Sequence, residues 1–81
     1  MPAKPKWAQL ADDIREQIAD DIREQIASGQ LTPGDKLPST AQFRAERGVS
    51  ASVVRQAVLV LQTQGLVAGV HGLGVFVAER H

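Results

Sequence analysis

The sequence contains no cysteine in its 81 residues. This absence excludes disulfide bonds and cysteine-ligated zinc sites, and it is compatible with a reducing compartment. Long apolar segments are also missing, because the longest strictly apolar run, residues 57–61, is far too short to span a bilayer. The basic start, MPAKPKW, is not followed by the apolar stretch of a secretory signal. We therefore expect one small cytoplasmic domain without a membrane partner.

An excess of either charge is missing too, because nine Lys and Arg residues offset nine Asp and Glu residues. Zero net charge argues against nucleic-acid binding driven by overall charge, but the positions of the charges matter more than their sum. Seven of the acids precede residue 36, whereas residues 36–81 hold five cations, two acids and both histidines. The second half of the chain is therefore mildly basic.

Catalytic motifs are likewise missing. The chain contains no recognisable nucleophile–base pair and no phosphate-binding loop. Four aspartates lie close together, but no histidine or other ligand stands at helical spacing from them, so we interpret them as a solvated helix face. They are Asp12, Asp13, Asp20 and Asp21. We expect no enzymatic activity, no metal site and no cofactor.

The most unusual feature that is present is an octapeptide, ADDIREQI, written twice without a spacer in residues 11–26. A helix is predicted over residues 7–27, because apolar residues recur every four positions with polar residues between them. Its apolar positions are Leu10, Ile14, Ile18, Ile22 and Ile26. Within each copy an aspartate can pair with the arginine three residues later, and Gly29 is a suitable stop.

A turn and the start of a second helix follow. The Pro-Gly pair at residues 33–34 predicts a tight turn, because proline presets φ and glycine accepts a positive φ. Leu31 and Leu37 flank this turn as the expected apolar anchors. Ser39 and Gln42 then have the spacing of a capping box, which marks the N-terminus of a helix.

Two helices joined by a glycine are predicted from this point. The capping box opens a short helix over residues 40–47, which Gly48 ends. Ser50 is a second N-cap candidate, and the helix after it runs over residues 51–64 and stops at Gly65. One face of that helix carries Val54, Val58 and Leu61. This spacing is typical of a helix-turn-helix.

The last part of the chain predicts a hairpin. Residues 66–70 and 74–78 are β-prone, and His71, Gly72 and Leu73 separate them. A long helix, a helix-turn-helix and a hairpin follow one another in this order in a winged helix.

The expected fold class is therefore α+β: a winged helix-turn-helix of three helices, the first one elongated, plus a two-stranded β-hairpin wing. We assign residues 1–6 to a flexible N-terminal tail and residues 7–78 to the winged helix domain. Residues 79–81 are a C-terminal tail.

Four segments of the chain carry a family resemblance. They are GQLTPGDKLPS, RGVSASVVRQAV, LQTQGLV and HGLGVFV. In this order and spacing they resemble the N-terminal DNA-binding domain of the GntR family of bacterial transcription regulators, over residues 10–78. The resemblance implies a sequence-specific regulator, such as a repressor, that binds double-stranded DNA. Its recognition helix over residues 51–64 would lie in the major groove, and the wing over residues 66–78 at the minor groove or the backbone.

The resemblance also implies which residues contact DNA. Ser39 and Ser50 would cap helices and offer hydroxyls or helix N-terminal amides to phosphates. Arg55 matches an arginine typical of the family, able to hold a phosphate or a guanine edge, and Ser52 projects from the same helix. Residues 71–72 match the wing tip, where glycine permits a close approach to DNA. The expected DNA-binding residues are Ser39, Arg44, Ser50, Ala51, Ser52, Arg55, Gln56, His71 and Gly72.

The chain also departs from the family pattern. Ala41 and Ala51 stand where the family usually has basic residues, with Arg44 as a candidate replacement, and each missing phosphate contact lowers affinity. Leu59 and Val60 stand where charged residues are more usual. These departures leave an alternative open, a winged-helix protein-interaction module with weak or no DNA binding. The family normally carries its effector-binding or dimerising domain C-terminal to the wing, so we expect no small-molecule effector site in these residues.

The duplication changes the register of the first helix. If the C-terminal copy sits where a single copy normally sits, Ile18 takes the place of Leu10. In the same way, Arg15 takes the place of Trp7. Eight helical residues add about 12 Å, so Trp7, Leu10 and Ile14 are expected on an overhang that no core covers. Such an apolar patch favours self-association as a homodimer, either as an antiparallel helix pair or by exchange of the first helix between chains. The alternatives are a first copy that loops out or frays, leaving Trp7 near its usual site, and a copying event without a selected role.

Overall fold

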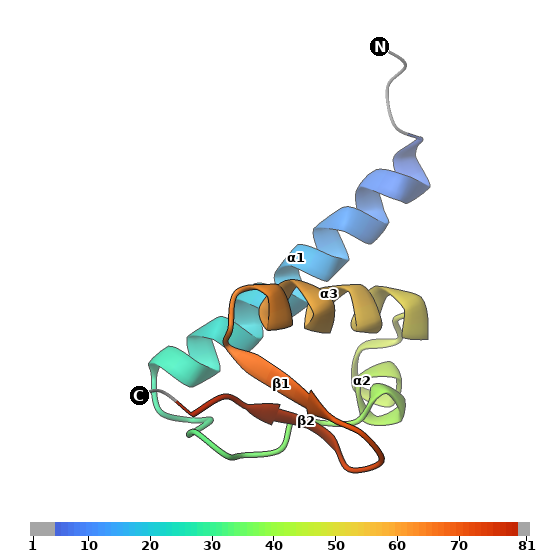
Figure 1. The fold of residues 1–81 in the computed structure, drawn as a ribbon. Helices are drawn as coiled ribbons and strands as arrows, with labels where there is room; N and C mark the ends of the chain where they lie inside the picture. The colour runs from blue at the N-terminus through green and yellow to red at the C-terminus, as the bar shows by residue number, and fades with distance from the viewer. Residues whose placement is uncertain (1–4, 80–81) are drawn as a thin grey trace.

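The fold has a long helix, a helix-turn-helix and a hairpin, in the predicted order (Figure 1). A computed structural model describes residues 5–79 of the chain. Its elements are α1 (Lys6–Ala27), α2 (Thr40–Arg47), α3 (Ala51–Thr63), β1 (Val67–Val70) and β2 (Gly74–Val77). Three helices and one two-stranded antiparallel sheet confirm the α+β winged helix architecture. Within the described residues, no helix is long and apolar enough to cross a membrane.

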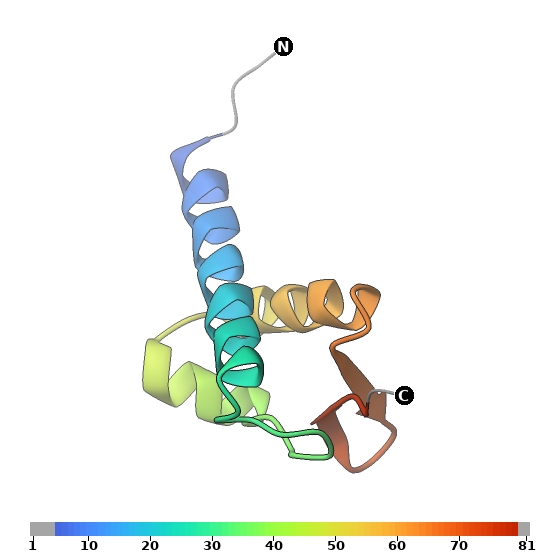
Figure 2. The same cartoon turned by 90° about the vertical axis from the view of Figure 1, so that its left-hand side faces the viewer.

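Both octapeptide copies belong to one uninterrupted helix. α1 spans 22 residues, and its N-terminal end projects from the body of the domain, as Figures 1 and 2 show. The alternative in which the first copy loops out is therefore wrong. α1 begins at Lys6, one residue before the predicted start and inside the predicted tail. Residues 1–4 of that tail and residues 80–81 of the C-terminal tail lie outside the described residues.

The core forms where α1, α2, α3 and the hairpin meet. α1 contributes Ile18, Ala19 and Ile22, each no more than 2% exposed. The other buried members are Leu37, Phe43, Val54, Ala57, Leu61, Val67 and Val77. Ile18 and Ile22 are fully buried, whereas Ile26, which the position of the second copy also predicts in the core, is half-buried at its edge.

The overhang of α1 is shorter than predicted. Ile14 is half-buried against the core, and it lines a shallow hollow together with Ile18 and Val49. Its assignment to an uncovered overhang is wrong, because α1 runs alongside α3 far enough for the segment that enters α3 to cover it. Trp7 and Leu10 are 73% and 60% exposed, as predicted.

The segment after α1 pairs with the hairpin, an arrangement that the sequence did not predict. β1 and β2 are antiparallel, with Val67 opposite Val77. Leu37 N donates a hydrogen bond to Val75 O at 2.8 Å. Val77 N donates to Asp35 O, also at 2.8 Å. This short added edge on β2 holds Leu37 in the core and brings the start of α2 beside the wing.

Asp35 stabilises the turn that precedes this pairing. Its carboxylate accepts hydrogen bonds from Thr32 N at 2.8 Å and from Thr32 Oγ1 at 3.0 Å. The backbone bond first, and then the hydroxyl bond, lower the pKa of Asp35 below its ordinary value, because both stabilise the charged form. A depressed folded-state pKa means that this stabilisation is present above the ordinary pKa. It is lost as the pH falls through the lowered pKa.

Candidate nucleic-acid interface

The two helices of the helix-turn-helix each begin with a serine cap. Ser39 Oγ accepts a hydrogen bond from Gln42 N at 3.1 Å, and Gln42 Oε1 accepts one from Ser39 N at 2.7 Å, which confirms the capping box. Ser50 Oγ accepts a hydrogen bond from Val53 N at 3.3 Å. Gly48 ends α2 with a left-handed φ of 64°. Both serines are exposed, so each hydroxyl can still donate its proton to an anion such as a phosphate.

α3 turns one face to the core and the other to solvent. Its buried face consists of Val54, Ala57 and Leu61. On the outer side Ser52 and Arg55 are exposed, whereas Ala51 is half-buried beside the cap. Arg55 forms no ion pair within residues 5–79. Ser52 and Arg55 therefore face solvent in the first turns of α3, where a recognition helix meets its target.

The two arginines of α2 differ in their surroundings. Arg44 is exposed and has no acidic partner in the part of the chain that the structure describes. Arg47 Nη1 donates to Asp21 Oδ2 at 2.7 Å, an ion pair that joins α2 to the second octapeptide copy. The sequence did not predict this pair, because the two residues are 26 positions apart. Arg44 is thus the arginine of α2 that is available to a ligand.

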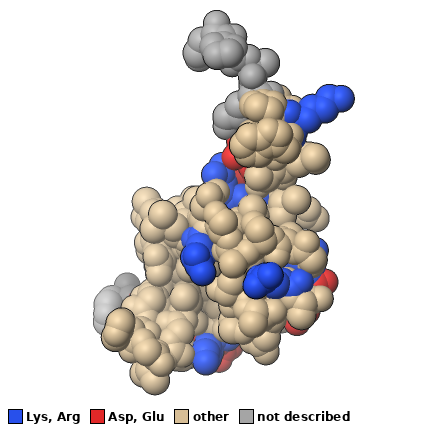
Figure 3. Space-filling view, turned by 90° about the vertical axis from the view of Figure 1, so that its right-hand side faces the viewer, with Lys and Arg blue, Asp and Glu red and all other residues tan. Residues whose placement is uncertain are grey.

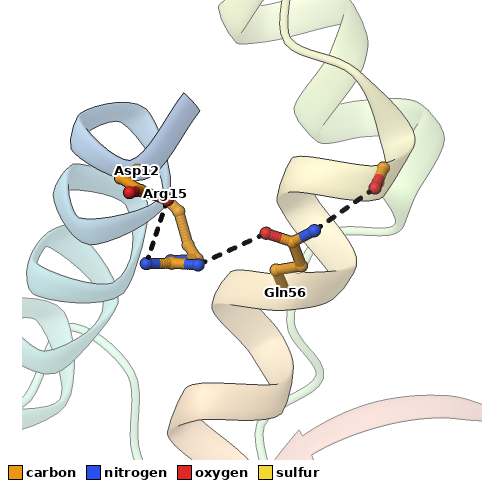
Figure 4. A network of polar contacts seen from close by, with 4 residues as sticks. Asp12, Arg15 and Gln56 are labelled. Atoms are coloured by element: carbon orange, nitrogen blue, oxygen red, sulfur yellow. Dashed lines mark hydrogen bonds and ion pairs between the residues drawn. The ribbon is translucent and has the colours of Figure 1, made fainter. Parts of the chain in front are cut away.

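Gln56, another expected contact residue, is held by its neighbours. Arg15 Nη1 donates to Gln56 Oε1 at 3.4 Å, and Gln56 Nε2 donates to Ser52 Oγ at 3.5 Å. Figure 4 shows Arg15 reaching across from α1 to Gln56 on α3, while Asp12 pairs with Arg15 at 3.3 Å. The outer face of α3 is therefore connected to the first octapeptide copy.

The wing tip is exposed, and a lysine lies across its base. His71 and Gly72 are exposed in the turn between β1 and β2, and Gly72 has a φ of 78°. Gly74 has a φ of 125°, and a Cβ atom there would lie 2.8 Å from Lys36 Cε. Lys36 is a cation that the sequence did not assign to the site, because only the pairing of its segment with β2 places it there.

A hollow connects the start of α2, α3 and the wing. Its lining includes Lys36, Ser39, Val58 and Leu73. On the face shown in Figure 3, Lys and Arg side chains lie in separate patches on a mostly uncharged surface, and Asp and Glu side chains show only small areas. The expected contact residues thus form a surface of separate cations and serine caps, without a continuous basic stripe.

The arrangement of the elements, with an exposed helix after a glycine turn and a hairpin beside it, defines a winged helix-turn-helix protein. The family described as bacterial regulatory proteins, gntR family, matches residues 14–77. The chain belongs to this family.

Two curated relatives are repressors or regulators by name. The chain is 49% identical, over 76 residues, to the mannosyl-D-glycerate transport/metabolism system repressor MngR of Escherichia coli (strain K12), which covers 94% of this chain and 28% of that protein. It is 39% identical, over 73 residues, to the Exu regulon transcriptional regulator of the same organism, which covers 90% of this chain and 25% of that protein. The chain therefore spans about a quarter of the length of these relatives.

Two solved structures share the fold. AraR(DBD) in complex with operator ORR3 superposes with a TM-score of 0.76 at 34% identity, over 79% of this chain and 77% of that one. A GntR family transcriptional regulator from Listeria monocytogenes superposes with a TM-score of 0.79 at 25% identity, over 99% of this chain and 63% of that one. These neighbours confirm the winged helix fold.

Proposed function

We propose that this chain binds double-stranded DNA sequence-specifically, as the DNA-binding part of a GntR-like repressor in the bacterial cytoplasm. α3 lies in the major groove, and the wing over residues 66–78 contacts the minor groove or the backbone. The observation that carries the proposal is Arg55, an exposed guanidinium without an acidic partner in residues 5–79, on the outer face of a helix whose other face is buried. The operator complex of AraR(DBD), which has the same fold, supports the proposal.

Each contact residue has a role that its chemistry suits. Arg55 donates to a guanine edge or to a phosphate, and Arg44 donates to the phosphate backbone. The caps at Ser39 and Ser50 bring exposed hydroxyls and helix N-terminal amides to phosphates. The wing tip at residues 71–72 approaches the DNA closely because Gly72 has no side chain.

The salt dependence of duplex-DNA binding tests this function. The affinity of the parent chain is expected to fall steadily as salt rises, because phosphate contacts release counterions. Arg55→Ala is expected to weaken binding about tenfold. Arg47→Ala is the matched control, since Asp21 already holds that guanidinium, and its affinity should stay close to that of the parent. If the parent binds no duplex even at low salt, the proposal is wrong.

The alternative of a protein-interaction module draws on the departures from the family pattern, among which Leu59 is an exposed apolar residue on α3. Leu59 is 60% exposed, one helical turn after Arg55. The relatives are named as repressors and regulators, which does not favour this alternative. A thymine methyl group also gives an exposed leucine an apolar partner inside the major groove.

We propose in addition that the overhang of α1 pairs two copies of the chain as a weak homodimer. Trp7 and Leu10 stand three residues apart, so they share one face of the projecting helix. In an antiparallel pair centred on Leu10, Lys6 of one copy comes close to Asp13 of the other, and symmetry makes this contact twice. The overhang is short, so it buries less than the roughly 800 Å² per partner of a stable interface.

Light scattering across a concentration series tests the pairing. The parent is expected to dimerise only in the high micromolar range, and Leu10→Asp to remain a monomer because a charge replaces the central apolar contact. Gln9→Asp, which adds the same charge at the neighbouring exposed residue, should dimerise like the parent. A parent chain that stays monomeric at the highest concentration contradicts the pairing.

A further inference from the structure

Both octapeptide copies reach α3 through the same pair of residue types. Arg15 Nη1 donates to Gln56 Oε1 at 3.4 Å, and Arg23 Nε donates to Gln64 Oε1 at 2.9 Å. The partners are 41 residues apart in both cases. Eight residues advance either helix by about 12 Å, so the repeat length in α1 matches the spacing of the two glutamines along α3.

The two contacts meet α3 at different places. Gln64 is the C-cap residue at the far end of the helix. Gln56 follows Arg55 directly, and its Nε2 donates to Ser52 Oγ one turn earlier at 3.5 Å. A chain of hydrogen bonds therefore runs from Arg15 through Gln56 to Ser52, onto the part of α3 that is proposed to read DNA (Figure 4).

The donors and acceptors of these side chains fix how the Gln56 amide is oriented. Arginine carries only donors, so the carbonyl oxygen of Gln56 faces Arg15, and this orientation turns the amide nitrogen to the oxygen of Ser52. Glutamine reads adenine by presenting both ends of its amide to N6 and N7 of the base. Because Arg15 and Ser52 hold the two ends of the Gln56 amide, Oε1 and Nε2 do not both point to a base.

Two donors remain free to face a ligand. They are the hydroxyl proton of Ser52, whose oxygen already accepts from Gln56, and the second N–H of the Gln56 amide. In the major groove, guanine presents acceptors at O6 and N7 and thymine presents one at O4. Ser52 and Gln56 therefore suit guanine or thymine, whose hydrogen-bonding groups in the major groove are all acceptors. They are poorly matched to adenine, which presents a donor at N6 beside its acceptor N7.

We propose that Arg15, supplied by the first octapeptide copy, is a positioning residue that turns Gln56 and Ser52 away from adenine and toward bases whose hydrogen-bonding groups in the major groove are all acceptors. This inference rests on the proposed DNA binding. Arg15 acts through Gln56 and needs no contact of its own with DNA. The repeat supplies a matched internal control, because Arg23 has the same sequence neighbours and the same kind of partner at the other end of α3.

Selection from a pool of randomised duplexes, with Arg15→Ala and Arg23→Ala beside the parent, tests the inference. Arg15→Ala is expected to raise the adenine preference at the base facing Gln56 by at least about fivefold, the lower end of what one bidentate base contact discriminates. Arg23→Ala should select the same sequences as the parent. The two arginine side chains are 30% and 34% exposed, so both variants are expected to fold.

Three further measurements separate positioning from other roles. The salt slope of binding should be unchanged in Arg15→Ala, because a lost phosphate contact would lower it by about one. In the free protein, the NMR signals of the Gln56 side-chain amide should shift in Arg15→Ala and stay in place in Arg23→Ala. The double variant Arg15→Ala with Gln56→Ala should select the same sequences as Gln56→Ala alone.

The possible results separate the positioning role of Arg15 from the proposed DNA binding on which it rests. A parent that binds specific duplexes while Arg15→Ala keeps the same base preference overturns the inference and leaves the proposed function intact. A lowered salt slope in Arg15→Ala also overturns it, because Arg15 would then contact DNA directly. A parent that binds no duplex overturns the proposed function and, with it, this inference.

Discussion

The two octapeptide copies have one sequence and two environments. Ile22 of the second copy is 2% exposed, whereas its equivalent in the first copy, Ile14, is half-buried. At the last isoleucine the order reverses, because Ile18 of the first copy is 1% exposed and Ile26 of the second is half-buried. The core is therefore centred on the junction between the copies, and the distance from that junction decides how deeply each isoleucine is buried.

The largest expected effect comes from truncating equivalent isoleucines. Ile22→Ala should lower the free energy of unfolding by about 2–5 kcal/mol, because it removes a fully buried side chain from a small core. Ile14→Ala should cost about 1 kcal/mol, since that side chain is only half-buried. Urea unfolding of the two variants beside the parent measures both losses.

Ile18 and Ile26 show whether the stability lost on truncation follows the burial of the side chain or the copy to which the residue belongs. Ile18→Ala should cost more than Ile26→Ala, although Ile18 belongs to the first copy. Equal losses within both pairs, or a consistently larger loss in the second copy, contradict a core centred on the junction.

A smaller effect should separate two equivalent aspartates. Asp21 pairs with Arg47 of α2, whereas Asp13, at the same place in the first copy, is exposed. Asp21→Asn is expected to cost about 0.5 kcal/mol, since ion pairs near the surface contribute little. Asp13→Asn should leave the unfolding midpoint unchanged. Thermal unfolding at low and at high salt checks the difference, which should shrink as salt screens the pair.

Local signals explain which parts of the structure were predictable. The capping box of Ser39 and Gln42 and the left-handed Gly48 act over a few residues, so they predicted the helix-turn-helix and its boundaries. The resemblance to the GntR family implied that Ser52 and Arg55 project from the recognition helix, and both side chains are exposed.

Long-range pairing explains what the sequence did not predict. The position of Lys36 at the wing depends on a strand pairing between distant segments. The contacts of α1 with Gln56 and Arg47 depend on how α1 is rotated against α2 and α3, and helical periodicity does not specify which polar groups then meet. Ile14 was misplaced for the same reason, because the segment before α3 covers it.

Deleting one octapeptide copy, residues 11–18, is the most direct test of the proposed role of the duplication in base preference. The shortened chain should fold, with Leu10 in the place of Ile18 and Trp7 in the place of Arg15. We expect it to bind duplex DNA with the salt slope of the parent when both are monomeric, because the exposed residues of α3 and the wing are unchanged. In a randomised-duplex selection its preference should shift toward adenine at the base facing Gln56, as in Arg15→Ala. A shortened chain that selects the same sequences as the parent contradicts the proposed role of Arg15 and of the duplication in base preference.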